Sequence, residues 1–165
     1  MGITERNPGA LDALRGRIKA LGSPAFKAER AQVLGAAAVK QVADCLRDSR
    51  DPYGEAYKPL TSRDGIPLRQ TGQLFNSTHD IQTSDGFQVV VDAHHPKTHN
   101  YGAVIKPITA RALFFMVRGV KAFAKMVTIP KRQMVPDAAR GLGTIWSKAF
   151  ADEDAALVRR HMGTA

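Results

Sequence analysis

Most of the histidines fall in one part of the sequence and are the residues best suited to chemistry in this chain: His79, His94, His95 and His99. His95 and His99 are four residues apart, which would place two imidazoles on one side of a helix, as zinc sites often require. Pro96 allows only a short first helical turn there, and only distant carboxylates such as Asp92 could complete a ligand set. We therefore expect exposed loop histidines and no metal site.

Other catalytic motifs are missing from the sequence. It contains no G-x-S-x-G nucleophile elbow, no G-x-x-x-x-G-K-[ST] phosphate loop and no G-x-G-x-x-G fingerprint. Glu29, Glu55 and Glu153 lie in unrelated contexts and do not predict the sheltered acid pair of a glycosidase. Cys45 has no base nearby in sequence, so we interpret it as a packed apolar residue. We expect no catalytic residue, no cofactor and no enzymatic activity.

The composition is that of an ordinary globular domain, with 165 residues of which 44% are hydrophobic and 24% charged. One domain over residues 1–165 is predicted, with residues 1–10 frayed. No apolar run approaches the roughly 20 residues that cross a bilayer, and the N-terminal residues show no apolar signal core. We therefore expect neither a membrane partner nor export.

The positive charge is concentrated in the second half of the chain. The net charge is +9, and residues 97–140 contain nine basic residues and one acid, Asp137, for a local net of 9 − 1 = +8. Such a surface could face DNA, whose phosphates attract cations. It could equally face an acidic protein neighbour, or simply be solvated.

A loop at the centre of the chain separates a helical front half from a strand-rich back half. Pro52 and Gly54 give it a turn signal. Three apolar residues in its first half stand among mainly polar neighbours, so we expect residues 49–73 to form a loop anchored to the body or to a neighbouring subunit, with these side chains substantially buried. The predicted anchors are Tyr53, Tyr57 and Leu60.

Apolar residues at helical spacing predict three helices. The first spans residues 11–21, and the last spans residues 137–160, with Gly141 and Gly143 weakening its start. The long second helix is predicted from Pro24 to about Arg47, since Ser23 and Pro24 form an N-cap signal. Helices thus account for most of residues 11–48 and 137–160.

Alternating apolar residues predict four strands between residues 74 and 130. Ser84–Gly86 and Arg118–Gly119 are predicted turns, and Pro130 ends the last strand. Residues 94–102 are expected to form a loop or a single turn. The predicted strands span residues 74–83, 87–92, 112–117 and 120–129. The predicted fold is therefore α+β, an antiparallel sheet of about four strands packed by the long helix and the C-terminal helix.

Three motifs occur in a particular order along the chain. Residues 51–60 read D-P-x-G-x-x-Y-x-P-L, residues 69–77 read R-x-T-G-x-L-x-x-S, and residues 129–135 read I-P-K-R-Q-M-V. Together with Tyr101 and Gly102, this order resembles the virion morphogenesis (tail-completion) proteins of tailed bacteriophages over about residues 30–137. Tyr57 stands where that family usually has tryptophan. The motifs are signatures of shape and not of catalysis.

The resemblance implies a structural virion protein: a tail terminator, tail-completion or neck subunit at the head–tail junction, assembled in the host cytoplasm. It implies partners too, namely further copies in a ring, commonly of six, and neighbouring tail-tube and neck or connector proteins. Non-specific contact with DNA in the lumen would fit the basic residues. The alternative is a small basic nucleic-acid-binding module, in which aromatic residues beside basic ones stack on bases.

The strands predicted between residues 112 and 129 have apolar side chains on both faces. An antiparallel sheet with one solvated face should alternate apolar with polar residues, so the second face needs a cover. A neighbouring subunit could supply it, or the C-terminal helix of the same chain could. The predicted interface residues are Phe114, Met116, Lys121, Phe123 and Lys125.

Overall fold

The computed structural model describes residues 8–61 and 64–163, which form five helices and six strands. The helices are α1 (Pro8–Ala20), α2 (Pro24–Asp48), α3 (Gln73–Asn76), α4 (Pro96–Tyr101) and α5 (Thr144–Met162). The strands are β1 (Thr78–Thr83), β2 (Gly86–Val91), β3 (Ala103–Ile105), β4 (Leu113–Val117), β5 (Val120–Ala124) and β6 (Val127–Ile129). The α+β class, the antiparallel strands, the long helix and the C-terminal helix are all confirmed.

The long helix α2 begins and ends where the sequence predicts. The Ser23 Oγ accepts a hydrogen bond from the Phe26 N–H at 3.1 Å and caps the first turn. The helix ends at Ser49, which adopts a left-handed conformation with φ of 53° and donates its N–H to the Cys45 carbonyl. Its buried face is directed at α5 on one side and at the β1–β2 hairpin on the other.

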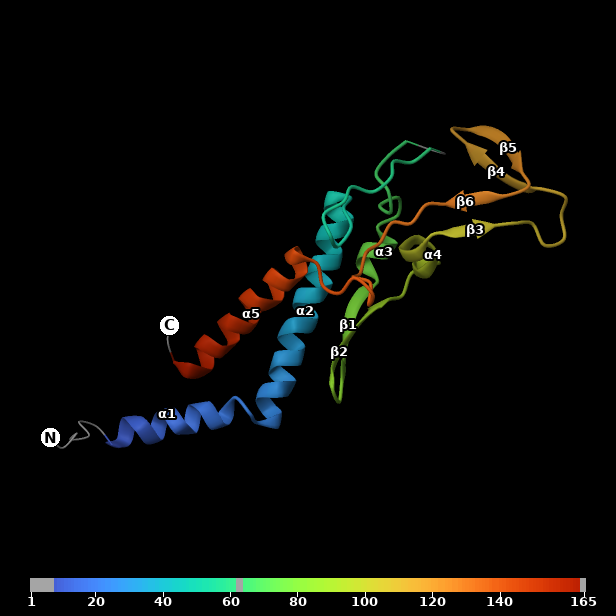
Figure 1. The fold of residues 1–165 in the computed structure, drawn as a ribbon. Helices are drawn as coiled ribbons and strands as arrows, with labels where there is room; N and C mark the ends of the chain where they lie inside the picture. Colours follow the sequence, from blue (N-terminus) through green and yellow to red (C-terminus); the bar gives the residue numbers. More distant parts are fainter. Residues whose placement is uncertain (1–7, 62–63, 164–165) are drawn as a thin grey trace.

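The hydrophobic core lies where α2, α5 and the β1–β2 hairpin meet. Val42 and Leu46 of α2 are completely buried, and Trp146 of α5 packs with them. Phe150 joins the helix to the hairpin through edge-on contacts with Trp146 and Phe87, at centroid distances of 5.9 and 6.3 Å. We call these three elements the body (Figure 1).

Polar contacts hold the N-terminal part of α2 against the C-terminal part of α5. Arg30 of α2 donates from Nη2 to the Asp154 Oδ2 of α5 at 2.8 Å. Glu29 pairs with the His161 Nε2 at 2.7 Å. Arg17 of α1 donates to the Met162 carbonyl at 2.7 Å, so the outlying first helix is tied to the last turn of α5.

The six strands form three separate antiparallel pairs instead of one sheet of about four strands. The pairs are β1–β2, β3–β6 and β4–β5. The strand predicted over residues 120–129 is divided, because the chain bends at Lys125 and Met126. Its second part, β6, turns away from β4 and pairs with β3, a strand of three residues that the sequence did not predict.

Several predicted boundaries were wrong for local reasons. Residues 8–10 belong to α1 and are not frayed, whereas residues 1–7 lie outside the described part. Residues 74–76 are helical because Gly72, with φ of 69°, starts the turn of α3. The last helix begins at Thr144 and not at residue 137. Gly141 has φ of 65°, and a Cβ on Gly143 would lie 2.8 Å from the Pro52 carbonyl, so this segment is held in a turn against the central loop.

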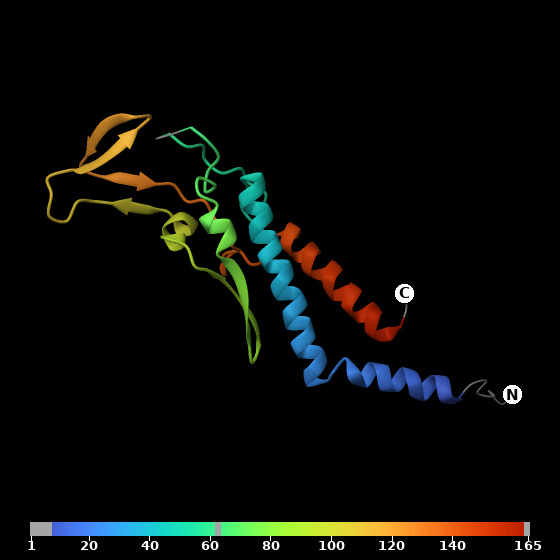
Figure 2. The same cartoon turned by 180° about the vertical axis from the view of Figure 1, so that it is seen from behind.

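The molecule has two ends of different character. In Figures 1 and 2, β3, β6 and the β4–β5 hairpin lie together at the end farthest from α1 and from the C-terminal end of α5. We call these four strands the distal lobe. Residues 94–102, predicted as a loop or single turn, contain the short helix α4 and lead from the body into this lobe. Among the described helices, none has the length and apolar content needed to cross a membrane.

Candidate interaction site

Tyr57 anchors the central loop to the segment that returns from the distal lobe. Its ring is buried, with 8% exposed, and its Oη donates a hydrogen bond to the Gln133 carbonyl at 2.8 Å. Burial raises the pKa of the phenol above its ordinary value, so it stays protonated and remains a donor. The predicted burial of this side chain is confirmed.

The other two predicted anchors are half-buried. The Tyr53 Oη donates to the Gly141 carbonyl at 3.1 Å and accepts from the Asp137 N–H at 2.9 Å, which links the loop to the turn before α5. The Arg140 guanidinium lies 3.7 Å from the centroid of the Tyr53 ring. Leu60 keeps part of its surface exposed and lines a groove described below.

Two buried polar side chains connect the segment after β6 to the central loop and to α4. The Arg132 guanidinium donates from Nε and Nη2 to the Lys58 carbonyl at 3.1 and 3.0 Å. The Asn100 Oδ1 accepts from the Met134 N–H at 2.8 Å. The segment after β6 is therefore fixed to both α4 and the central loop, although the strands beyond it are not.

The β4–β5 hairpin separates its side chains into two faces. Arg118 and Gly119 connect the strands with φ of 48° and 83°, the two positive values of a type I′ turn. Directly paired residues share a face, since side chains alternate along each strand. The pairs Phe114–Phe123 and Met116–Lys121 therefore form one face, which we call the outer face. Phe115, opposite Ala122, belongs to the inner face.

The outer face is exposed in the part of the chain that the structure describes. Phe114 is 56% exposed, Met116 50% and Phe123 70%, and the two phenyl rings contact one another at 5.3 Å. The structure thus brings four of the five predicted interface residues together, with Lys125 just after β5. The C-terminal helix does not cover this face. It packs on α2, on the side away from the β4–β5 hairpin (Figures 1 and 2).

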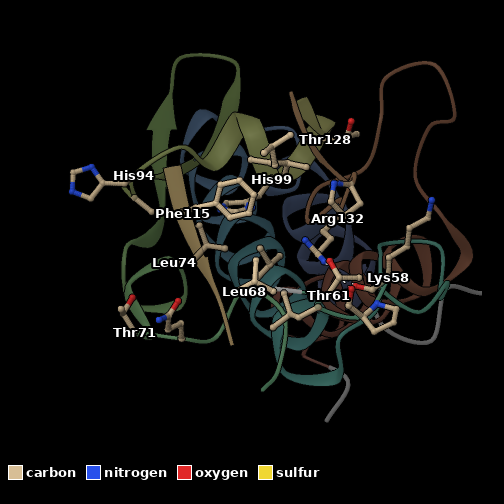
Figure 3. A pocket seen from close by; sticks show the side chains of 18 of the residues that line it. Lys58, Thr61, Leu68, Thr71, Leu74, His94, His99, Phe115, Thr128 and Arg132 are labelled. Carbon is tan, nitrogen blue, oxygen red and sulfur yellow. Dashed lines mark hydrogen bonds between the residues drawn. The ribbon is translucent and has the colours of Figure 1, made fainter. Parts of the chain in front are cut away.

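The inner face forms the roof of a groove of about 960 Å³, with the central loop and α3 on the opposite side. Leu68 and Leu74 lie beneath it, and Phe115 lies in its middle (Figure 3). Lys58 is at one end of the groove, and His94 is at the other. Its lining within the described residues includes no aspartate or glutamate. The groove therefore combines apolar walls with basic groups.

The histidines do not form a metal centre in the described residues, where no group of three or more histidine, cysteine or acidic side chains could hold an ion. His94 is exposed, as predicted, but His99 is half-buried in the groove wall. The His99 Nδ1 is buried without a hydrogen-bond partner in the described structure. Burial, with help from the charges of Arg132 and His95, lowers the pKa of this imidazole.

Cys45 is buried beside the core, in agreement with its interpretation as a packed apolar residue. Burial raises the pKa of its thiol to about 11, which leaves almost no thiolate at neutral pH. The thiol is therefore unsuited to nucleophilic attack.

Comparisons of the chain with protein-family models, curated proteins and solved structures found no match. The order of motifs and the geometry of the distal lobe are therefore the observations that bear on function.

Sequence reasoning missed the groove and its basic residues. Arg132 was counted with a surface patch, yet only 6% of it is exposed. Lys58 is one lysine in a mainly polar loop, and nothing in its neighbouring sequence predicts a place in a groove. All three motifs, at residues 51–60, 69–77 and 129–135, supply residues of the groove lining, but as signatures of shape they do not predict a site.

Proposed function

We propose that this chain is a structural subunit of a tailed-phage virion, a ring-forming tail-completion, tail-terminator or neck protein at the head–tail junction. The ordered motifs at residues 51–60, 69–77 and 129–135 support the family, and the α+β fold agrees with it. The virion is then its location, and its neighbours are copies of itself with tail-tube and neck proteins.

The observation that carries this proposal is the uncovered outer face of the β4–β5 hairpin. A two-stranded hairpin is at best marginally stable in water unless a helix or further strands cover it. The outer face places Phe114, Met116 and Phe123 in solvent at the end of the molecule. A second copy can cover it, and a head-to-tail contact that closes gives a ring.

The test replaces one aromatic side chain of the outer face at a time. Phe114→Asp and Phe123→Asp place a charge in the proposed contact without touching the core of the body. We expect both variants to fold by circular dichroism, to remain monomeric in sedimentation velocity, and to fail to complement a phage that lacks this chain. Ile108→Asp is the matched control, since Ile108 is 99% exposed in the loop before β4 and should tolerate the charge. Folded Phe114→Asp and Phe123→Asp proteins that still build joined, infectious particles would refute the hairpin contact.

The proposed role is not catalytic. Burial raises the pKa of the Cys45 thiol and leaves it unsuited to nucleophilic attack. The chain acts in this proposal by shape and by contact.

A nucleic-acid-binding module is the second candidate, because the outer face also sets basic residues beside aromatic ones. Lys121 is paired with Met116 next to the exposed phenyl rings, and Arg118 is at the hairpin tip. Aromatic faces with cations beside them can bind single strands by stacking. Mass measurements at low and high salt, with and without DNA, separate the candidates: a defined ring without DNA supports assembly, whereas a monomer that shifts only with DNA supports binding.

A further inference from the structure

We propose that the groove beneath the β4–β5 hairpin binds an extended acidic peptide segment of a partner protein, laid along the open edge of β6. This inference concerns the inner face of the hairpin and goes beyond the ring contact, which uses the outer face.

The wall of the groove includes an unpaired strand edge. In the described structure β6 pairs with β3 alone, so its other edge has no strand beside it. Every residue from Met126 to Pro130 lines the groove, which places the β6 backbone at its wall. An extended peptide can add to such an edge through main-chain hydrogen bonds, while pockets for alternate side chains give specificity.

The apolar lining suits one face of an extended peptide. Phe115 and Val117 of β4 and Ala124 of β5 face the groove from above, and Leu68 and Leu74 face it from below. Alternate side chains of a strand point to opposite sides. One set of peptide side chains would therefore enter an apolar slot. The volume of about 960 Å³ is near the upper end for small-molecule pockets and leaves room for several peptide residues.

The charge of the groove determines which residue type suits the second set of peptide side chains, those that do not enter the apolar slot. Lys58 and Arg132 line it together with His94 and His99, and no carboxylate does so within the described residues. The sequence from 97 to 136 contains eight basic residues and no acid, so the surroundings add to the positive potential. Complementary charge favours a peptide with glutamate or aspartate, and would repel a basic one. A nucleic acid is less suited, because the described lining offers a strand edge, many aliphatic side chains and a single phenyl ring, Phe115.

An occupant would also stabilise the hairpin. None of the residues from Tyr101 to Lys131 is buried, although the inner-face side chains are apolar. A peptide strand under the hairpin would cover that face and add a third strand beside β6. We therefore expect slower amide exchange in β4, β5 and β6 when the groove is filled.

The experiment uses two fluorescein-labelled peptides of equal length, one alternating valine with glutamate and the other alternating valine with lysine. Fluorescence anisotropy with the full chain should show saturable binding of the glutamate peptide and none of the lysine peptide. Lys58→Glu should weaken binding of the glutamate peptide by about tenfold or more, through loss of charge complementarity. Lys97→Glu is the matched control, because Lys97 is an exposed lysine of α4 outside the groove lining and should keep its affinity.

A steric variant tests the position of the peptide without changing charge. Ala124→Trp fills the groove from the hairpin side and should abolish binding, with folding verified by circular dichroism. Phe114→Asp should leave peptide binding intact while it disrupts assembly of the subunit ring. The groove proposal and the ring proposal can therefore be refuted independently.

The groove proposal is overturned if neither peptide binds, if both bind equally, or if Lys97→Glu weakens binding as much as Lys58→Glu does. A competing oligothymidine strand gives a further test. The proposal is also overturned if this strand displaces the glutamate peptide from the Lys97→Glu protein and binds the Ala124→Trp protein with unchanged affinity. The peptide and the strand would then share a surface outside the groove.

Discussion

The body and the distal lobe both contain many apolar residues and yet differ in how much apolar surface they bury. Val42, Leu46 and Leu157 in the body are completely inaccessible. In the lobe, none of the residues from Tyr101 to Lys131 reaches the buried class, although both faces of the β4–β5 hairpin carry apolar side chains. A hydrophobic face contributes to stability only where something covers it. The difference indicates that the body is held by its own buried contacts, whereas the lobe leaves much of its apolar surface exposed in the described structure.

The charges of the two regions differ in the same sense. In the body, Arg30 pairs with Asp154, and Glu29 pairs with His161. Residues 101–131 of the lobe include basic residues and no acid, and their ion pairs reach outside it, from Arg118 to Asp64 at 3.7 Å and from Lys131 to Asp137 at 3.9 Å. Such exposed pairs contribute little to stability. The excess positive charge of the lobe therefore adds little to the stability of the fold.

The largest effect should come from removing a leucine from the body. Leu157→Ala deletes a completely buried side chain of α5, and we expect the free energy of unfolding to fall by about 2 to 5 kcal/mol, from lost burial and the remaining cavity. Urea denaturation measures this. Leu113→Ala in β4 is the matched change in the lobe, where the side chain is only half-buried, and should cost about 1 kcal/mol or less. Equal losses would mean that the lobe is packed as the body is.

The joint between the two regions should be nearly as sensitive. Tyr57→Ala removes a buried ring from the central loop, and we expect a loss of about 2 to 4 kcal/mol. Tyr57→Phe keeps the ring but leaves the Gln133 carbonyl without its donor, which should cost about 1 kcal/mol. Thermal unfolding of the two variants separates packing from hydrogen bonding. An unchanged melting temperature in Tyr57→Ala would show that the loop is not held through this residue.

The sequence predicted well those features that depend on neighbouring residues. The Ser23–Pro24 cap and the apolar stripe placed α2 within one residue of its observed end, and alternation placed β2 and β4. Tyr57 could be identified as an anchor because an aromatic ring in a polar loop needs a place to pack.

What could not be predicted depends on long-range geometry. The pairing of β3 with β6 joins two three-residue strands far apart in sequence, too short to give a periodic signal. The bend at Lys125 and Met126 follows from that pairing. The groove exists only because the bend places the inner face of the hairpin above the central loop. Arg132 looked like a surface charge because nothing near it in sequence reveals the carbonyl oxygens that it binds.

A small effect on stability combined with a large effect on assembly is expected at the outer face. Phe123→Ser removes a ring that is 70% exposed, so the free energy of unfolding of the monomer should change by no more than about 0.5 kcal/mol. Self-association, measured by sedimentation equilibrium over a range of concentrations, should weaken at the same time. A marked loss of monomer stability would show that the Phe123 phenyl group packs within its own chain.

The smallest effect is expected from His99, where the lobe meets the body. Burial lowers the pKa of its imidazole in the folded chain, and Arg132 and His95 add to this. The unfolded chain then binds the proton more readily. This contribution to stability is present above the ordinary pKa of about 6.5 and is lost as pH falls toward the folded value. Urea unfolding below and above that pH should therefore show a steeper acid loss in the native chain than in His99→Gln. His94→Gln, which removes an exposed imidazole, should retain the native steepness. If His99→Gln and the native chain lose stability in parallel between neutral pH and the onset of carboxylate protonation, the buried Nδ1 does not resist protonation, and the groove wall at this point is wetter than its burial indicates.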